Sequence, residues 1–328
     1  MNISVAMCTY NGERYLLEQL QSIAAQTRLP DELVVSDDQS TDSSLDIIAA
    51  FQASASFPVH LQINPSNVGS TRNFEQAIAR CEGDIIALCD QDDVWLPTKL
   101  QRMAECFLRE PAVGLMFSDA EVVDEELHPL GYRLWESVGF DDAHRHMVRT
   151  GRVLDVLLPG WTVTGATMAF RSRFRNLVLD IPTNLALIHD GWIALMIALV
   201  ADVSFTEEPL IKYRQHARQQ IGAKERKASA GSRVALGDVK RAMQRKNSYE
   251  EMIEIGSQAR HRLLEQGNQY QTADALCRLE ARLTHLTARA HLPQGKLSRA
   301  RCVIGELLSR RYHLYSNGFR SAVKDLLA

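Results

Sequence analysis

Three carboxylates stand within four residues in the run Asp90-Gln91-Asp92-Asp93. The run follows the apolar segment Ile85–Cys89, which is typical of a buried strand, and acids crowded at a strand end repel one another. A divalent cation relieves that repulsion, and hard oxygen ligands suit Mg²⁺ or Mn²⁺ better than zinc. The alternative is a helix N-terminus carrying acids, where negative charge is favoured without a ligand. We favour a cation site with Asp90, Asp92 and Asp93 as ligands.

A second acidic pair, Asp37-Asp38, ends the apolar segment 33–35 and is followed by residues 40–42 (STD). A carboxylate at such a strand end can accept hydrogen bonds from a base or a ribose hydroxyl. Helix capping is the alternative, and it explains residues 40–42 better than it explains the acidic pair. Residues 67–73 (NVGSTRN) are typical of a turn leading into a helix, where backbone amides and Arg72 can face a diphosphate.

Several classes of protein are disfavoured by what the sequence lacks. No GxGxxG motif follows the first predicted strand and no GxxxxGK[ST] motif occurs, which disfavours dehydrogenases and P-loop kinases. The six cysteines form no CxxC pair and no Cys/His spacing suited to zinc, so we expect reduced thiols. If a nucleotide binds, we expect a metal ion rather than a glycine loop to neutralise its phosphates.

The elements that must position these residues are βα units on a mostly parallel sheet, because short apolar runs alternate with helical patterns. The predicted strands are residues 3–8, 32–36, 59–63 and 85–89. A polar loop follows each strand, at residues 9–12, 37–40, 64–69 and 90–93. Since ligands bind at the carboxyl edge of such a sheet, we expect the four loops to converge on one crevice.

The rest of the chain divides into an acceptor half and a helical region. We expect residues 94–97 (VWLP) to begin a helix with Pro97 in its first turn. Residues 113–118, 164–170 and 203–206 have extended patterns, whereas residues 190–200 have a helical one. From residue 224 onward the pattern is almost wholly helical. The predicted domains are an α/β domain at 1–222, made of halves 1–110 and 111–222, and a helical region at 223–328.

Charge is distributed unevenly between these two domains. Residues 223–328 carry 20 Lys and Arg against 10 Asp and Glu, or +10, which leaves −13 for residues 1–222 of a chain at −3. The basic region either attracts an anionic surface such as a membrane or is a solvated helical surface. No signal-peptide pattern opens the sequence, and the most apolar segment, 192–203, is shorter than the roughly 20 residues of a spanning helix. We expect a cytoplasmic protein whose membrane role is peripheral, at the inner face.

At these positions the sequence resembles the family 2 glycosyltransferases, which have the GT-A fold, a Rossmann-like nucleotide-diphospho-sugar transferase sheet. The resemblance covers most of residues 1–222. It includes residues 4–12 (SVAMCTYNG), Ser22 with Gln26-Thr27, residues 37–42 (DDQSTD), 67–69 (NVG) and 90–95 (DQDDVW). The last of these, together with residues 213–216 (YRQH), is similar to a rhamnosyltransferase-like branch that builds bacterial surface polysaccharides such as O-antigen.

The resemblance implies roles for the donor-side residues. Those assigned to the substrate are Thr9, Tyr10, Asn11, Asp38, Arg72 and Asp90. Among them, Thr9, Tyr10 and Asp38 hold the base and ribose, and Arg72 lies near the donor. Asp90, Asp92 and Asp93 form the metal-binding motif, with Asp92 and Asp93 approaching the cation and the diphosphate.

The resemblance also implies an acceptor side. The family's catalytic base is a carboxylate at the start of a helix, and the matching position here is Asp190. His189 stands where the family usually has another acid; we assign it to the substrate side and favour packing or support of Asp190 over direct catalysis. Residues 164–168 flank the acceptor or close over the diphosphate. Arg214 and His216 alternate on an extended segment and can face one anion together.

The expected function is therefore an inverting glycosyltransferase that uses Mg²⁺ or Mn²⁺ and a nucleotide-sugar donor. A dTDP-linked sugar such as rhamnose is the first choice of donor, and a UDP-sugar is the second. The acceptor is a glycan or a lipid-linked molecule, and no nucleic-acid partner is expected. A nucleotidyltransferase, which releases pyrophosphate, and a non-catalytic nucleotide- or glycan-binding module are the alternatives.

Overall fold

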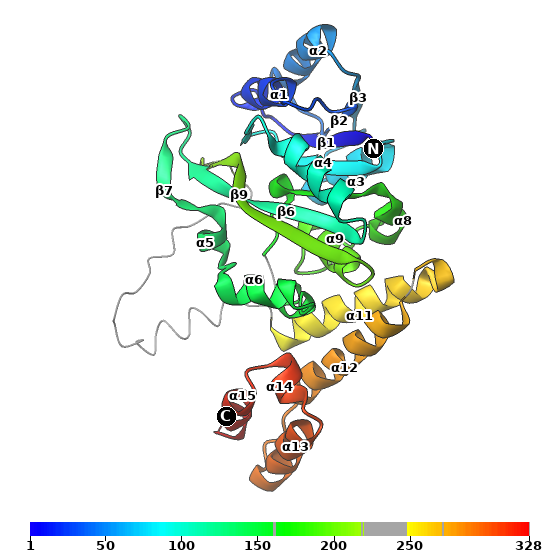
Figure 1. Ribbon diagram of the computed structural model, residues 1–328, viewed down its shortest axis with the longest axis vertical. Coiled ribbons are helices and arrows are strands. Elements are labelled where there is room, and N and C mark those ends of the chain that lie inside the picture. The colour runs from blue at the N-terminus through cyan, green and yellow to red at the C-terminus, as the bar shows by residue number, and fades with distance from the viewer. Residues whose placement is uncertain (160–161, 218, 220–247, 271, 328) are drawn as a thin grey trace. The chain divides into compact units, whose positions relative to one another are not determined.

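The computed structural model describes residues 1–159, 162–217, 219, 248–270 and 272–327. Two compact units are distinguished by their internal contacts, an α/β unit and a helical unit (Figure 1). The α/β unit holds a sheet of nine strands in the order β3-β2-β1-β4-β8-β6-β9-β5, with β7 paired to β6. The predicted α/β class is therefore confirmed. The predicted boundary between residues 222 and 223 lies outside the described residues and stays a prediction.

The first half of the sheet is parallel, as the alternating pattern predicts. Its strands and helices are β1 (Ile3–Thr9), α1 (Leu16–Ala24), β2 (Glu32–Asp37), α2 (Ser44–Ser54), β3 (Val59–Ile63), α3 (Ser70–Arg80) and β4 (Ile85–Cys89). Strand β1 pairs in parallel with β2 and β4, and β2 with β3. The four predicted strands match these elements, because buried β-branched and aliphatic residues end where polar loops begin.

The second half of the sheet is mixed. Its elements are β5 (Val94–Trp95), α4 (Lys99–Arg109), β6 (Val113–Val123), β7 (Pro129–Arg133), α5 (Leu134–Val138), α6 (Asp142–Arg149), α7 (Leu154–Leu157), β8 (Met168–Arg171), α8 (Arg175–Val178), α9 (His189–Ala198) and β9 (Asp202–Arg214). Strand β8 is antiparallel to both β4 and β6, and β9 is parallel to β6.

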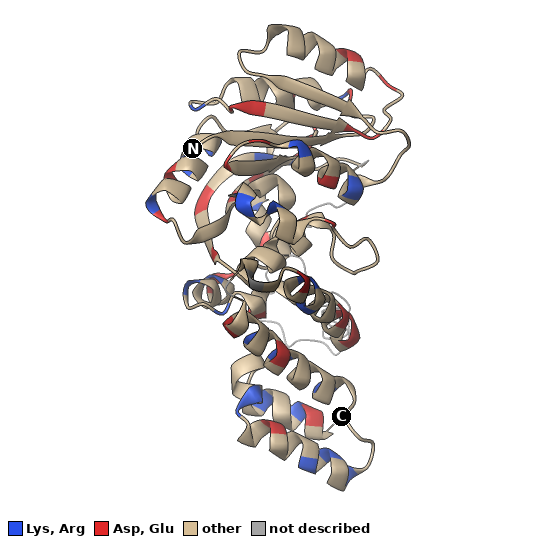
Figure 2. Ribbon diagram, turned by 90° about the vertical axis from the view of Figure 1, so that its right-hand side faces the viewer, with Lys and Arg blue, Asp and Glu red and all other residues tan. Residues whose placement is uncertain are grey.

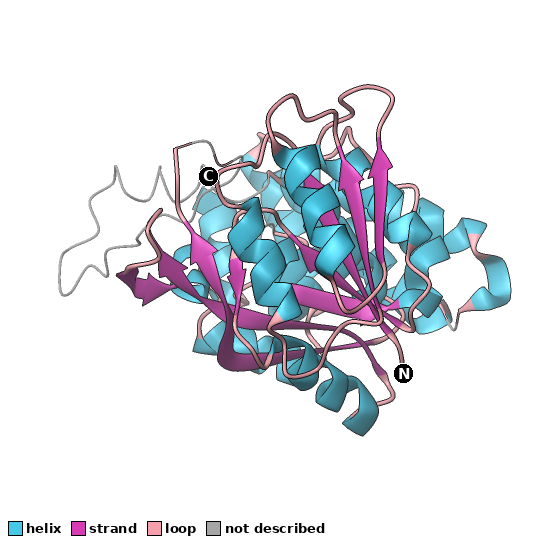
Figure 3. Cartoon of the chain, turned by 90° about the horizontal axis from the view of Figure 1, so that it is seen from above, coloured by secondary structure: helices cyan, strands magenta, loops and turns pink. Residues whose placement is uncertain are grey.

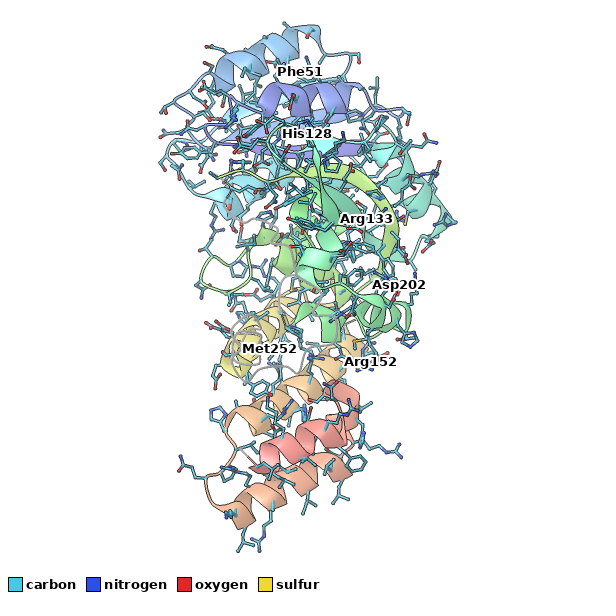
Figure 4. All side chains as sticks on the ribbon, turned by 90° about the vertical axis from the view of Figure 1, so that its left-hand side faces the viewer. Phe51, His128, Arg133, Arg152, Asp202 and Met252 are labelled. Atoms are coloured by element: carbon cyan, nitrogen blue, oxygen red, sulfur yellow. The ribbon has the colours of Figure 1, made fainter. Side chains whose placement is uncertain are left out.

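Helices cover both faces of this sheet (Figure 3). Alternate residues of β1, namely Ile3, Val5 and Met7, belong to a core cluster that also takes in residues of α1, α2 and α4. One member of that cluster is Phe51 of α2 (Figure 4). Helix α3 contacts β1, β2 and α9. Alternate residues of β1 therefore point to opposite faces of the sheet and pack against different helices.

Two local predictions were wrong. Residues 94–97 do not begin a helix, because Val94 and Trp95 form β5 and pair with Lys212 and Ile211 of β9, so α4 begins only at Lys99. Residues 164–170 are not one extended segment, since Gly165–Thr167 form a 3-10 turn before β8. In both places a partner distant in sequence overrides the local pattern.

The described part of the helical unit consists of α11 (Tyr249–Glu265), a 3-10 turn at Gly267–Gln269, α12 (Ala273–Ala290), α13 (Lys296–Leu308), α14 (Arg311–Tyr315) and α15 (Phe319–Leu327). Positions 223–247 of the predicted basic region lie outside the described residues. A small core of Val303, Tyr312 and Ala322 joins α13, α14 and α15. Among the helices that are described, none is long and apolar enough to cross a membrane.

Candidate active site

The carboxyl ends of β1 and β2 meet at one edge of the sheet, as the sequence predicts. Pairing in register sets Thr9 beside Asp37, and the Thr9 hydroxyl donates to Asp37 Oδ2 at 2.7 Å. The same carboxylate, which is buried, accepts from the amide and the hydroxyl of Ser40 at 2.8 and 2.6 Å. Asp37 therefore holds the loops after β1 and β2 together at this edge of the sheet. The Thr9 side chain, which was predicted to hold the base or ribose, is buried beside Asp37.

Gln91 shapes the loop after β1, a role that the sequence analysis missed. Its amide oxygen accepts from the Tyr10 backbone amide at 2.8 Å, and its amide nitrogen donates to the Tyr10 carbonyl at 3.0 Å. A Cβ atom on Gly12 would lie 2.3 Å from the same Gln91 oxygen, so a larger residue there would displace the Gln91 side chain from this position. Asn11 takes a left-handed φ of 46° and accepts from the Thr41 amide at 2.8 Å. The Tyr10 ring stays 49% exposed beside the edge.

Asp38 organises the turn that leads into α3. Its Oδ1 accepts from the Val68 amide at 2.8 Å and from Asn64 Nδ2 at 3.0 Å, and its Oδ2 accepts from the Gly69 amide at 2.8 Å. The expectation that amides of this turn face a diphosphate is therefore wrong for Val68 and Gly69. Contact of Asp38 with a base or ribose stays a prediction.

Arg72, predicted to lie near the donor, occupies the first turn of α3. Its guanidinium pairs with both carboxylate oxygens of Glu75 at 2.7 Å. Glu75 also accepts from the Ile181 amide at 2.6 Å. A donor contact by Arg72 stays a prediction, and it requires the side chain to leave or share Glu75.

The acidic run follows β4, and its three carboxylates differ in surroundings. Asp93 is buried; its Oδ1 accepts from the Arg214 amide at 3.0 Å, and its Oδ2 has no hydrogen-bond partner among the described residues. Burial, then Asp92 and Asp90, raise the pKa of Asp93 well above its usual value. Burial, then Asp92 and Asp190, raise the pKa of Asp90 to about 7. Acids thus face acids here, which is the repulsion that the sequence analysis assigned to a cation site.

Arg214 and His216, predicted to face one anion together, both contact the acidic run. Arg214 is buried, and its three guanidinium nitrogens donate to the Asp92 carbonyl at 2.7 Å, to the Glu125 carbonyl and to the Glu18 carboxylate. All three nitrogens are therefore taken up by partners within the protein, one of them the Glu18 carboxylate, and Arg214 holds the acidic run in place. His216 Nε2 lies 2.8 Å from Asp92 Oδ2, so its ring borders the predicted cation site.

Lys99 is a buried cation below the run that the sequence analysis also missed. Its ammonium donates to the Ala166 carbonyl at 2.6 Å and lies 3.7 Å from the centre of the Trp95 ring. Burial lowers the pKa of Lys99 to about 7, against the opposing effect of Cys89, Asp93 and Asp90. The only sequence signal was a lysine at the first position of a strongly amphipathic helix, which is usually a solvated position.

Asp190 stands in the first turn of α9 and lies near the acidic run, since its charge contributes to the raised pKa of Asp90. Its Oδ2 accepts from the Gly165 amide at 3.1 Å, and its Oδ1 accepts from the Gly191 amide at 2.6 Å. Burial raises the pKa of Asp190 to about 6, while these two amides act to lower it. Asp190 is therefore an ionised carboxylate at neutral pH that takes up a proton in mild acid.

His189 packs within the protein. Its buried ring stacks on Phe74 of α3, with centroids 4.1 Å apart, and burial lowers its pKa to about 3. A Cβ atom on Gly165 would lie 3.1 Å from His189 Nε2. The ring is thus neutral and packs beside the segment that carries Asp190, as the packing role favoured from the sequence requires. A substrate contact by His189 stays a prediction.

The acidic run fits a divalent cation that shares its ligands with a substrate. An orphaned oxygen on Asp93 and a histidine beside Asp92 supply hard or borderline donors. Mg²⁺ usually binds one or two carboxylates together with substrate phosphates, so the protein need not form a closed cage. The tightest triad of metal-binding side chains in the described part of the chain lies elsewhere, at Asp124, Glu126 and His128 in the β6–β7 turn (Figure 4). There Asp124 accepts from the amides of the other two residues, as turn residues do.

Comparison with known proteins identifies relatives of this chain. The family model for glycosyl transferase family 2 matches residues 4–177. An uncharacterised glycosyltransferase of Nostoc sp. is 31% identical over 66% of this chain and 65% of its own length. A dTDP-rhamnosyl transferase of Shigella flexneri, RfbG, is 29% identical over 66% of this chain and 74% of its own length. The chain thus spans slightly less than two thirds of the Nostoc relative.

Similarity in three dimensions concerns the fold alone. The structure of S. aureus TarS with UDP-GlcNAc superposes with a TM-score of 0.57 at 17% identity, covering 99% of this chain and 82% of the other. At that identity the superposition supports the α/β architecture and says nothing about the sugar.

Proposed function

This chain belongs to glycosyl transferase family 2 and has the GT-A fold, and we propose that it transfers a sugar from a nucleotide-sugar donor with inversion at the anomeric carbon. The proposal is supported by the nearness of Asp190 to the acidic run: the Gly165–Thr167 turn donates to Asp190 and accepts from Lys99, and the charge of Asp190 contributes to the raised pKa of Asp90. A group that takes a proton and groups that hold a leaving diphosphate must flank the same reacting carbon.

The donor would lie along the edge formed by the loops after β1, β2 and β4. Tyr10 offers an exposed ring to the base, with Thr9, Asn11 and Asp38 fixing the loop around it. Arg72 would approach the diphosphate on exchanging its contact with Glu75. Binding at this edge follows the general rule for open α/β sheets.

Asp90, Asp92 and Asp93 would hold Mg²⁺ or Mn²⁺, and His216 would complete the set. Such a cation, when bound, stabilises negative charge on the departing nucleoside diphosphate. Arg214 and Lys99 are positioning residues: Arg214 fixes the Asp92 backbone, and Lys99 ties the base of the run to the turn at Ala166. That turn also donates to Asp190, so donor and acceptor sides share one scaffold.

Asp190 would accept the proton of the acceptor hydroxyl as the new glycosidic bond forms. Its pKa of about 6 leaves it ionised at neutral pH yet more basic than an ordinary aspartate. One base acting in a single displacement would invert the configuration at the anomeric carbon. Its two amide donors hold the carboxylate in a fixed orientation.

The sugar and acceptor are finer proposals. Similarity to RfbG favours a dTDP-linked deoxysugar such as rhamnose, and UDP-sugars are the second choice. We assign the acceptor to a glycan or lipid-linked precursor of a bacterial surface polysaccharide, made at the cytoplasmic face of the membrane. The α/β unit would carry the transfer and residues beyond 222 would form a separate helical domain.

A donor screen that detects released nucleoside diphosphate tests the proposal. Purified protein with Mn²⁺ is given dTDP-rhamnose, UDP-glucose and UDP-GlcNAc in turn, with Asp190→Asn as the matched control. Release of nucleoside diphosphate by the parent protein and not by the control supports a transferase. Release of pyrophosphate from a nucleoside triphosphate would instead identify a nucleotidyltransferase, and donor binding without turnover would identify a binding module.

A further inference from the structure

Two helices of the helical unit expose large apolar side chains. On α13, Leu297 is 84% and Leu308 is 80% exposed; on α15, Phe319 is 67% and Leu327 is 82% exposed. Single exposed apolar residues are common, but these recur at helical spacing. The exposed apolar residues are Leu297, Ile304 and Leu308 on α13, and Phe319, Val323, Leu326 and Leu327 on α15. We call these seven residues the apolar stripes.

The apolar stripes are distinct from the core of the unit. Positions 297, 304 and 308 lie on one face of a helix, because position 304 is about two turns and position 308 about three turns after position 297. The core faces of the same helices are formed by Val303 and Ala322, which pack with Tyr312. Each helix is thus apolar on two faces, and the outer face is largely exposed, although the Phe319 ring lies edge-on to His313 of α14 with centroids 4.8 Å apart.

The charge around the apolar stripes has a single sign. Residues 296–327 contain two acids, Glu306 and Asp325, and both are buried. Glu306 pairs with His285 at 2.7 Å and with Arg311 at 2.8 Å, and Asp325 pairs with Arg289 at 2.6 Å. The same stretch contains Lys296, Arg299, Arg301, Arg310, Arg311, Arg320 and Lys324. Blue segments mark these cations on the C-terminal helices in Figure 2.

We propose that α13 and α15 bind the surface of an anionic lipid bilayer. The apolar stripes would enter the boundary between headgroups and acyl chains, and the surrounding Lys and Arg side chains would meet lipid phosphates. Apolar side chains flanked by cations are the composition of helices that lie in a membrane interface. Basic residues near a membrane are attracted by its negative surface potential.

Charge also argues against the two other occupants of such a surface. A symmetric contact with a second copy brings the same patch together with itself, so its cations would repel without exposed acids to offset them. A nucleic acid would satisfy the cations, but its phosphate backbone leaves exposed leucines in water. A lipid surface satisfies both features at once.

Sedimentation of the full chain with vesicles tests the inference, and it needs no donor sugar, so its outcome is independent of the transferase assignment. Vesicles of equal parts phosphatidylglycerol and phosphatidylcholine are compared with vesicles of phosphatidylcholine alone. We expect binding to the anionic vesicles only, weakening as salt rises because surface charges are screened. Equal binding to both vesicles, or none to either, would overturn the proposal.

Two sets of substitutions separate the apolar and charged contributions. Combined Leu297→Ser, Leu308→Ser and Phe319→Ser, or combined Arg301→Gln, Arg320→Gln and Lys324→Gln, should each lower vesicle affinity at least about tenfold. Leu108→Ser, at an exposed position on α4, is the matched control and should bind like the parent. Circular dichroism verifies that each variant keeps its helices.

Any of three results would contradict the lipid proposal. They are unchanged vesicle affinity in both combined variants, self-association of the parent that the serine variant abolishes, and duplex DNA binding that the glutamine variant abolishes while the serine variant does not.

Discussion

Two buried clusters of charge in this protein are built on opposite principles. In the helical unit each buried acid faces a base, as Asp325 faces Arg289 and Glu306 faces His285 and Arg311. At the edge of the sheet, acids lie near acids: Asp92 and Asp190 raise the pKa of Asp90, and Asp92 and Asp90 raise that of Asp93. A paired cluster holds a fold together without a ligand, whereas an unpaired one raises the free energy of the protein until a cation binds.

The largest expected effect belongs to Asp190. Asp190→Asn keeps the shape of the side chain and an oxygen for one of its two amide donors but removes the base, so kcat should fall by about 10²–10⁴. Initial rates of nucleoside diphosphate release measure the loss. Asp202→Asn, at the start of β9, is the control and should leave kcat unchanged; a similar kcat for Asp190→Asn and the parent would remove Asp190 as the base.

Removal of one acid from each cluster should change stability in opposite directions. Asp325→Asn leaves buried Arg289 without its ion pair and should lower the free energy of unfolding by about 3–5 kcal/mol. Asp93→Asn relieves repulsion and keeps an oxygen for the Arg214 amide, so it should raise the stability of the metal-free protein.

Urea unfolding with and without Mn²⁺ measures both variants. In the parent, Mn²⁺ should raise the midpoint, and in Asp93→Asn it should raise it less, because a ligand is lost. If Asp93→Asn proved as damaging as Asp325→Asn in the absence of metal, the distinction between the two clusters would fail.

Substitution of Lys99 tests whether its positive charge offsets part of the repulsion within the acidic cluster. Lys99→Met removes the charge below the run and leaves the Ala166 carbonyl without its donor, which should cost about 1–3 kcal/mol of stability. The Mn²⁺ concentration for half-maximal activity should fall, because the carboxylates keep less positive charge beside them. Lys99→Arg should restore part of the stability; an unchanged Mn²⁺ requirement in Lys99→Met would show that Lys99 only packs.

The smallest effect is on the pH profile. The pKa of Asp190 is raised to about 6, so the base is ionised above that pH and protonated below it. At saturating Mn²⁺ we expect kcat/KM to be flat above about pH 7 and to fall about tenfold per pH unit below 6. A profile that stays flat down to pH 5 would mean that no carboxylate with a raised pKa accepts the proton.

The sequence predicted the parallel half of the sheet and the convergence of its loops. Segments such as 32–36 and 85–89 are short, apolar and followed at once by polar residues, so their strand ends are visible locally. It failed at residues 94–97, where pairing with β9 decides the conformation, and at Gly165–Thr167, where a turn is fixed by Lys99 and Asp190. Local pattern cannot reveal partners that lie 25 or 67 residues away along the chain.

What the sequence alone determined was the chemistry: acids after β4, a carboxylate at the head of α9 and the family to which the chain belongs. Only the tertiary structure decided which charges are paired. Arg214, expected to bind an anion, donates to the Asp92 carbonyl, and Gln91 accepts from the Tyr10 amide. Lys99 is buried against the Trp95 ring. A side chain's type is written in the sequence, but its electrostatic role depends on burial and on neighbours that only the folded chain brings together.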